Sequence, residues 1–224
     1  MRIGARFNGP AGSANGGYAA GRLAAFLGDG PAEVTLRLPP PLERDLTVDG
    51  HDGAVELRDG DALVAEGRRL DGLDVEMLPP VSVEAARAAG AATPLREGHP
   101  FPTCFGCGPD RAEHDGLHCL CGPVQGRSDG VWAVGWVPEA SARELVWAAL
   151  DCPSAAPFLQ PDRPLVLGRI AARVDRVPEP GEPLAVMSWA LGEDGRKRAS
   201  ASALVDAGGR VLAAARATWI ALRA

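Results

Sequence analysis

Four cysteines and two histidines lie within one short stretch of the sequence, and both residue types bind zinc. They are Cys104, Cys107, Cys119, Cys121, His114 and His118. The first two cysteines have the separation of a metal-binding pair, whereas a single residue separates the other two, which is less usual. A structural zinc ion is therefore one interpretation. Reduced thiols are the other, favoured by the odd number of five cysteines and by the lack of a recognisable secretion signal.

A compact basic cluster, Arg196-Lys197-Arg198, contains the only lysine of a chain whose formal net charge is -6. Guanidinium and ammonium groups at the start of a strand can bind phosphate groups. The alternative is a solvated turn, because the cluster directly follows Glu193-Asp194-Gly195. The overall negative charge argues against nucleic-acid binding.

Asp151 follows the apolar run Trp147-Ala148-Ala149-Leu150, and Asn15-Gly16-Gly17 precedes another apolar stretch. Asp151 can cap a helix that begins near Cys152, because Pro153 is well suited to a first helical turn. Asn15 suits an N-cap, and two glycines allow a tight helix start that packs closely on a sheet. Cys152 has no histidine near it in the sequence and is interpreted as a buried thiol.

The elements that would position these residues occur twice in the same order. Capping and spacing patterns predict a helix over 18–27, followed by strands over 33–38, 46–49, 54–58 and 62–65. In the second half they predict a helix over 144–159, followed by strands over 165–174, 184–189, 198–205 and 210–220. Strands joined by hairpins need no crossover helices, so the predicted class is α+β with antiparallel sheets.

The middle of the chain separates the two predicted units. Pro79-Pro80 precede an Ala-rich stretch over 83–92 that predicts a short helix, and an irregular connection is expected over 93–102. We therefore place an N-terminal unit at 1–80, a linker at 81–100 and a C-terminal unit at 101–224.

Three short motifs carry a resemblance to a known family. Cys104-Phe105-Gly106-Cys107-Gly108, with Gly116-Leu117 after it, resembles the opening segment of many hot-dog fold thioesterases of the phenylacetate-pathway type. The segment 147–151 resembles the part of their central helix that ends in the catalytic acid, and Asn15-Gly16-Gly17 resembles their His-Gly-Gly motif. The duplicated order is similar to acyl-CoA thioesterase II, which carries two such units in one chain. The resemblance implies a tandem (double) hot-dog, each half an antiparallel sheet wrapped around a central helix.

The activity that this resemblance implies is hydrolysis of an acyl thioester, with coenzyme A as part of the substrate and no further cofactor. Backbone N–H groups of Gly16 and Gly17 would stabilise the oxyanion, and Asp151 would activate water or attack the carbonyl. Ala24 stands at the acid position of the first half, and Arg143-Glu144 stand where the second half would carry glycines. We therefore expect one composite active site, meaning a site formed by residues of both halves.

Further site residues follow from the same resemblance. Asn15 replaces the histidine of the family motif and is a candidate catalytic group as well as an N-cap. Trp147, one helical turn before Asp151, is expected to line the substrate channel. Thr218 stands near the position of a glutamine in thioesterase II and is a candidate substrate-binding residue. Arg196, Lys197 and Arg198 would bind the phosphates of coenzyme A or of a carrier-protein phosphopantetheine. Relatives with a Cys-Phe-Gly-Cys-Gly segment do not generally need zinc there, so we expect no metal site.

The composition limits the other classes of protein to which the chain can belong. The 224 residues are 46% hydrophobic and 23% charged, which is typical of one large or two small globular domains. No apolar run approaches the roughly 20 residues that cross a bilayer, so no membrane span is expected. With reduced thiols, this predicts a cytoplasmic protein. Sheet edges left by two fused units can pair between chains, which allows a homodimer.

Three functional hypotheses differ in class. The leading one is an acyl thioesterase that acts on acyl-CoA. The alternative is a non-catalytic hot-dog protein that binds an acyl thioester or a protein partner, since the histidine and glutamine of the family are absent. A hydratase or dehydratase ranks last, because it needs a histidine paired with a carboxylate. All four histidines lie outside the predicted central helices.

Overall fold

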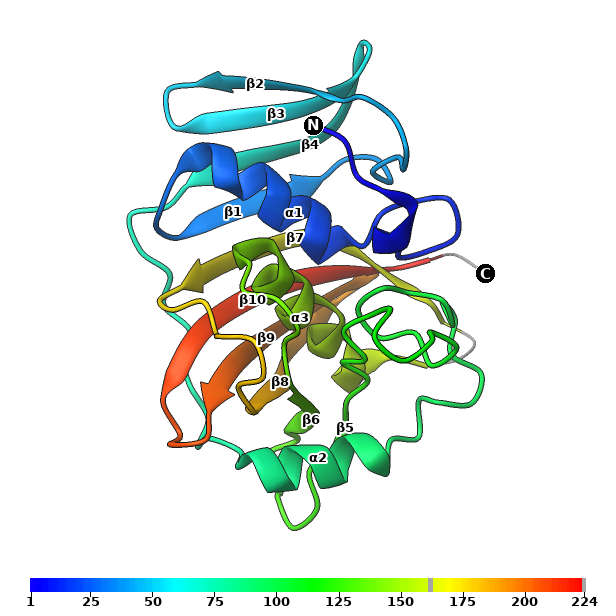
Figure 1. Ribbon diagram of the computed structural model, residues 1–224, viewed down its shortest axis with the longest axis vertical. Helices are drawn as coiled ribbons and strands as arrows, with labels where there is room; N and C mark the ends of the chain where they lie inside the picture. Colours follow the sequence, from blue (N-terminus) through cyan, green and yellow to red (C-terminus); the bar gives the residue numbers. More distant parts are fainter. Residues whose placement is uncertain (161–162, 223–224) are drawn as a thin grey trace.

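A computed structural model describes residues 1–160 and 163–222 of the chain (Figure 1). Within these residues, ten strands form one antiparallel sheet in the order β2-β3-β4-β1-β7-β10-β9-β8-β6-β5. The first-half strands are β1 (Ala32–Leu36), β2 (Thr47–His51), β3 (Ala54–Asp59) and β4 (Ala62–Arg69). The second-half strands are β5 (Gly122–Pro123), β6 (Trp132–Trp136), β7 (Leu165–Val174), β8 (Leu184–Asp194), β9 (Lys197–Asp206) and β10 (Val211–Ala221).

The two halves pair their strands in the same order. In the first half, β1 pairs with β4, β4 with β3, and β3 with β2. In the second half, β7 pairs with β10, β10 with β9, and β9 with β8. The halves join where β1 pairs with β7, which sets Val34 opposite Ile170. The predicted α+β class and the repeated order of elements are confirmed, whereas β5 and β6 were not predicted.

Two helices lie side by side on the same face of the sheet (Figure 1): α1 (Gly16–Ala24) and α3 (Arg143–Ala155). Short 3-10 turns continue them over Ala25–Leu27 and Ala156–Phe158, and another precedes α1 at Ala5–Phe7. The helices approach closely because Gly21 has no side chain; an added Cβ there would lie 2.8 Å from Glu144 Cα. Among the described residues, no helix has the length and apolar character that a membrane span requires.

The segment predicted as a linker at 81–100 contains α2 (Val83–Ala91) and an irregular stretch. Ser82 caps α2, since its Oγ accepts the Ala85 N–H at 3.2 Å. Val81 and Ala86 pack in a core that includes Met187 and Trp189 of β8. Side chains alternate along a strand, so this core lies on the sheet face opposite the one whose core includes Leu184 and Val186. The helix within the predicted linker therefore packs against the sheet.

Candidate functional site

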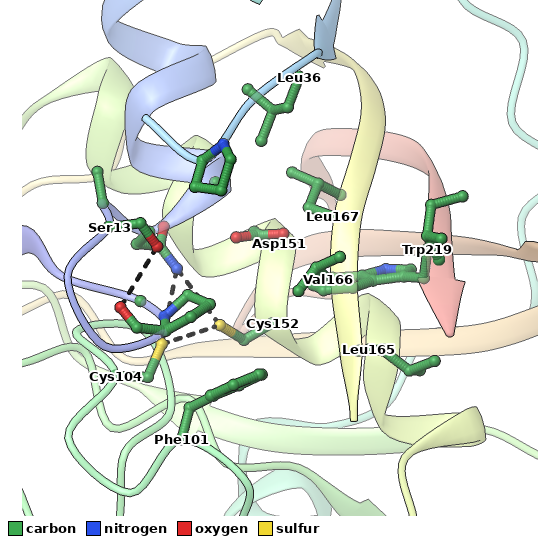
Figure 2. A pocket seen from close by; sticks show the side chains of 18 of the residues that line it. Ser13, Leu36, Phe101, Cys104, Asp151, Cys152, Leu165, Val166, Leu167 and Trp219 are labelled. Carbon is green, nitrogen blue, oxygen red and sulfur yellow. Dashed lines mark hydrogen bonds between the residues drawn. The ribbon is translucent and has the colours of Figure 1, made fainter. Parts of the chain in front are cut away.

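A cavity of about 490 Å³ lies where the two halves meet. The first half contributes the loop before α1 and the end of β1, and the second half contributes the end of α3 with β7 and β10. Figure 2 shows Asp151 and Cys152 of α3 facing this space together with side chains of β7. Most of the wall is apolar: Leu36, Leu38, Phe101, Ala155, Leu159, Leu165, Val166, Leu167, Trp219, Ile220 and Leu222.

Asp151 is the carboxylate of this cavity and is 1% exposed. Its Oδ2 accepts a hydrogen bond of 2.7 Å from the Gly17 N–H. Its Oδ1 is buried and has no hydrogen-bond partner among the described residues. Burial raises the pKa of Asp151 to about 7, and the bond from Gly17 partly opposes that rise. A carboxyl group titrating in this range can both accept and release a proton near neutral pH.

Asp151 does not cap a helix, so that alternative interpretation is wrong. It lies within α3, which continues through Cys152 and Pro153 to Ala155. Pro153 has no N–H and leaves the helix locally short of a hydrogen bond. Nearby, the Ser154 Oγ donates to the Asp151 carbonyl at 2.7 Å and accepts the Trp219 Nε1–H at 2.8 Å. These bonds tie the end of α3 to β10 directly beside the carboxylate.

The two predicted glycines have different surroundings. Gly16 lines the cavity and is the first residue of α1, where a backbone N–H has no acceptor within the helix. Gly17 is not a lining residue, and its N–H is already bonded to Asp151. A Cβ at Gly17 would lie 2.3 Å from Asp151 Cβ, so glycine is required for this contact. Gly16 is thus the member of the pair with a donor free to meet a ligand.

Asn15 is the N-cap of α1, as one interpretation of the sequence predicted. Its Oδ1 accepts the Tyr18 N–H at 2.8 Å, and its Nδ2 lies 3.4 Å from Cys152 Sγ and 3.8 Å from Cys104 Sγ. It also lines the cavity. Asn15 therefore joins the start of α1 to a group of thiols on the second half.

Cys104, Cys107 and Cys152 gather at one end of the cavity, whereas Cys119 and Cys121 are buried outside it. Hydrogen bonds from the Cys107 and Cys152 thiols hold the pKa of Cys104 well below its usual value. The same interactions with the Cys104 sulfur raise the pKa of Cys107 and of Cys152. The sequence separates Cys152 from the other two by a long stretch, so their proximity was not predicted.

His99 was also missed as a site residue, because it falls in the stretch that the sequence marks as irregular. It lines the cavity; its Nδ1 accepts the Phe101 N–H at 3.1 Å, and its Nε2 lies 3.5 Å from Cys107 Sγ. Burial lowers the pKa of His99. The neutral ring therefore carries its proton on Nε2 and donates toward the sulfur, which leaves it no free nitrogen to act as a base.

Two predicted substrate-binding residues lie outside the cavity wall. Trp147 is 2% exposed and packs between the helices, where a Cβ added at Gly21 would lie 2.9 Å from Trp147 Cβ. Thr218 is half-buried and does not line the cavity, although its neighbours in β10, Trp219 and Ile220, do. A register shift between Thr218 and Trp219 interrupts the alternation of side chains along β10. Spacing in the sequence therefore does not show which of these residues faces the cavity.

The basic cluster lies beside the cavity without lining it. Lys197 pairs with Ile220, and Arg198 with Trp219, across the β9–β10 ladder. Arg196 and Lys197 are exposed, and Arg198 forms an ion pair with Glu193 at 3.1 Å. The cluster therefore lies at the start of β9, next to two residues of β10 that line the cavity. Arg196 and Lys197 are open to solvent.

Comparison with known proteins shows the fold. No protein-family model and no curated protein matches the sequence. A conserved protein of unknown function with a hot-dog fold from Alicyclobacillus acidocaldarius superposes over 100% of this chain and 92% of its own, with TM-score 0.64 and 11% identity. Acyl-CoA thioesterase II TesB2 from Mycobacterium marinum superposes over 93% and 89%, with TM-score 0.56 and 11% identity. The PpsC dehydratase domain from Mycobacterium tuberculosis, in complex with C12:1-CoA, superposes over 93% and 85%, with TM-score 0.54 and 16% identity.

The chain therefore has the hot-dog fold. More particularly, it is a double hot-dog, because two helix-and-sheet units with the same strand order occupy one chain and share one sheet.

Proposed function

We propose that this protein hydrolyses acyl thioesters, with acyl-CoA as the substrate class, at a composite site formed by both halves. One observation carries the proposal. A buried carboxylate, Asp151, lines a largely apolar cavity, has one oxygen without a hydrogen-bond partner among the described residues, and lies against the start of α1. Those are the groups that a thioester hydrolase needs: a proton acceptor, backbone donors for an oxyanion and space for an acyl chain.

In the proposed reaction, water attacks the thioester carbonyl carbon while Asp151 accepts a proton from it. The Gly16 N–H stabilises the negative charge that develops on the carbonyl oxygen, aided by the helix dipole of α1. The tetrahedral intermediate then breaks its C–S bond, and Asp151 returns the proton to the departing sulfur. The products are a carboxylic acid and a thiol. Gly17 takes no direct part, because its N–H holds the carboxylate in position.

The chemistry of the walls supports an acyl group as the part of the substrate that enters. Leu165 and Leu167 of β7 and Trp219 of β10 are apolar and line the cavity. Burial of an alkyl chain against such a wall contributes roughly 0.8 kcal/mol per CH₂ group. The five free thiols also fit a reducing compartment, so we place the protein in the cytoplasm.

The direct test is a panel of acyl-CoA esters of increasing chain length, with released thiol as the readout. We expect saturable release of coenzyme A that depends on protein concentration. The non-catalytic alternative predicts saturable binding of the same esters, measured by calorimetry, without release of thiol. Binding without release would contradict the proposal, as would the absence of both.

The basic cluster offers a test of the coenzyme A part of the proposal. Replacing Arg196 and Lys197 with alanine should raise KM for acyl-CoA roughly tenfold, since a charge-assisted hydrogen bond contributes about 1.5 kcal/mol. KM for the matching N-acetylcysteamine thioester, which has no phosphates, should not change. The matched control is Arg87→Ala on α2, an exposed arginine that lines no part of the cavity. Equal effects on both substrates would show that the pair does not recognise the nucleotide.

A further inference from the structure

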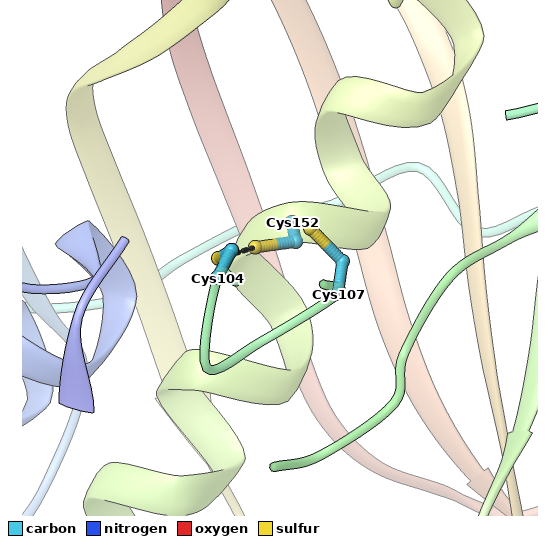
Figure 3. Close-up of side chains that lie close together, drawn as sticks. All are labelled: Cys104, Cys107 and Cys152. Atoms are coloured by element: carbon cyan, nitrogen blue, oxygen red, sulfur yellow. Dashed lines mark hydrogen bonds between the residues drawn. The ribbon is translucent and has the colours of Figure 1, made fainter. Parts of the chain in front are cut away.

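Three cysteines form a compact cluster at the wall of the cavity, and thioester hydrolysis does not use it. The ligating atoms of Cys104, Cys107 and Cys152 all lie within 4.8 Å of one another. Figure 3 shows their side chains converging, two from the loop 104–107 and one from α3. A loop and a helix that are far apart in sequence thus present three sulfur atoms to one point.

The distance between two of the sulfur atoms matches that of ligands around a tetrahedral ion, and the third lies within 4.8 Å of both. With Zn–S bonds of about 2.3 Å, tetrahedral geometry sets sulfur atoms about 3.8 Å apart. Cys104 Sγ and Cys152 Sγ are 3.6 Å apart. A two-residue separation such as that of Cys104 and Cys107 is the spacing by which one loop supplies two ligands to a zinc ion.

The surroundings of the cluster suit thiolates. Asn15 directs its Nδ2–H₂ group at Cys104 and Cys152, and His99 directs Nε2 at Cys107. Such donors are the outer contacts that orient sulfur ligands and stabilise their charge. Gly106 lets the loop close over the cluster, because a Cβ there would lie 2.6 Å from Cys152 Sγ. The loop backbone is therefore fitted around the three sulfur atoms.

We propose that Cys104, Cys107 and Cys152 bind one Zn²⁺ ion. Three soft sulfur ligands close to one another select zinc over the oxygen-preferring cations. His99 contacts the ligand Cys107 and does not itself complete the site, since its Nδ1 accepts the Phe101 N–H. The fourth position is open to a water or a ligand group, because all three cysteines line the cavity. The ion links the loop 104–107 to the end of α3. This structural role does not depend on whether the protein hydrolyses thioesters.

This assignment differs from both sequence-based interpretations of the cysteines. The resemblance predicted no metal, whereas we propose a metal site. The candidate ligands in the sequence included Cys119 and Cys121, whereas the proposed site uses Cys152 in their place. Cys119 and Cys121 are 1% exposed and lie in the core with Leu120 and Val134. They provide matched controls, because they are cysteines of the same chain and the same degree of burial as Cys104.

The test is metal content, measured by mass spectrometry on purified protein that has been reduced, loaded with Zn²⁺ and dialysed. We expect one zinc per chain in the wild type, in Cys119→Ser and in Cys121→Ser. We expect its loss in Cys104→Ser, Cys107→Ser and Cys152→Ser, with circular dichroism reporting that each variant is folded. Co²⁺ in place of Zn²⁺ should give the sulfur-to-cobalt charge-transfer band of a tetrahedral thiolate site.

Several results would overturn the proposal. One is a reduced wild-type protein that retains no zinc and shows no charge-transfer band with Co²⁺. Another is zinc that stays bound when any of the three cysteines is replaced, or that is lost equally in the two control variants. If a variant fails to fold, the cobalt spectrum of the wild type decides alone. A Cys104–Cys152 disulfide in the isolated protein, with no metal uptake after its reduction, would replace the metal site with a redox pair.

Discussion

Replacing Asp151 with asparagine should reduce kcat on the best acyl-CoA substrate by about 10²- to 10⁴-fold, the usual contribution of a general base. The asparagine Oδ1 can still accept the Gly17 N–H, so the contact between α1 and α3 is kept. The amide then places its NH₂ group at the position of Asp151 Oδ1, and an amide nitrogen accepts no proton. The loss should appear in kcat, because the chain still binds the substrate.

Stability separates this result from simple damage to the fold. Asp151 is buried and one of its oxygens has no partner, so a neutral amide removes a desolvation cost. The melting temperature of Asp151→Asn should therefore equal or exceed that of the wild type. Glu144→Gln is the control on the same helix, since Glu144 does not line this cavity. Thiol release at the wild-type rate by Asp151→Asn would refute the role proposed for this carboxylate.

The fold was predictable because its signals are local and occur twice. The pattern over 165–174 matches β7 residue for residue, and Pro39-Pro40-Pro41 and Gly28 mark ends that the structure places nearby. Two strands escaped prediction for physical reasons. β5 contains only two residues, and β6 has buried side chains on both faces, so neither presents a clear alternation.

The candidate site was predictable only where the residues lie on regular elements. Asp151 and Gly16-Gly17 sit on helices whose mutual packing follows from the repeat, and the structure brings them into contact. His99, Cys104 and Cys107 reach the cavity through a long irregular stretch whose path no periodic pattern encodes. A shift in strand register likewise decides that Trp219 lines the cavity and Thr218 does not. Tertiary contacts of this kind have no signature in spacing.

The pairing of Gly17 with Asp151 makes the helix contact and the candidate active site one structural feature. A Cβ at position 17 would lie 2.3 Å from Asp151 Cβ and 2.7 Å from the Trp147 carbonyl oxygen. The second of these atoms belongs to the backbone of α3, which cannot move without the whole helix. Gly17→Ala must therefore separate α1 from α3 or distort one of them.

We expect Gly17→Ala to destabilise the protein by about 3 kcal/mol, the upper part of the usual cost of overpacking a core. For a chain of this size, that corresponds to a fall in melting temperature of roughly 6 to 12 °C. Thiol release should fall with it at temperatures where the variant remains folded, because displacement of α1 moves the Gly17 N–H away from Asp151. Differential scanning calorimetry and the acyl-CoA assay measure the two effects separately.

Gly16→Ala is the matched control for stability, because the same substitution one residue earlier meets different neighbours. A Cβ at Gly16 would lie 2.9 Å from Leu167 Cδ2 and 3.1 Å from Leu36 Cδ1. These two atoms are ends of flexible side chains at the wall of a cavity and can shift into open space. The remaining neighbour, Leu167 Cβ at 3.0 Å, needs to give by only a few tenths of an ångström. The melting temperature should therefore fall much less in Gly16→Ala than in Gly17→Ala. Equal losses would mean that the close approach of α1 to α3 at Asp151 does not limit the stability of the fold.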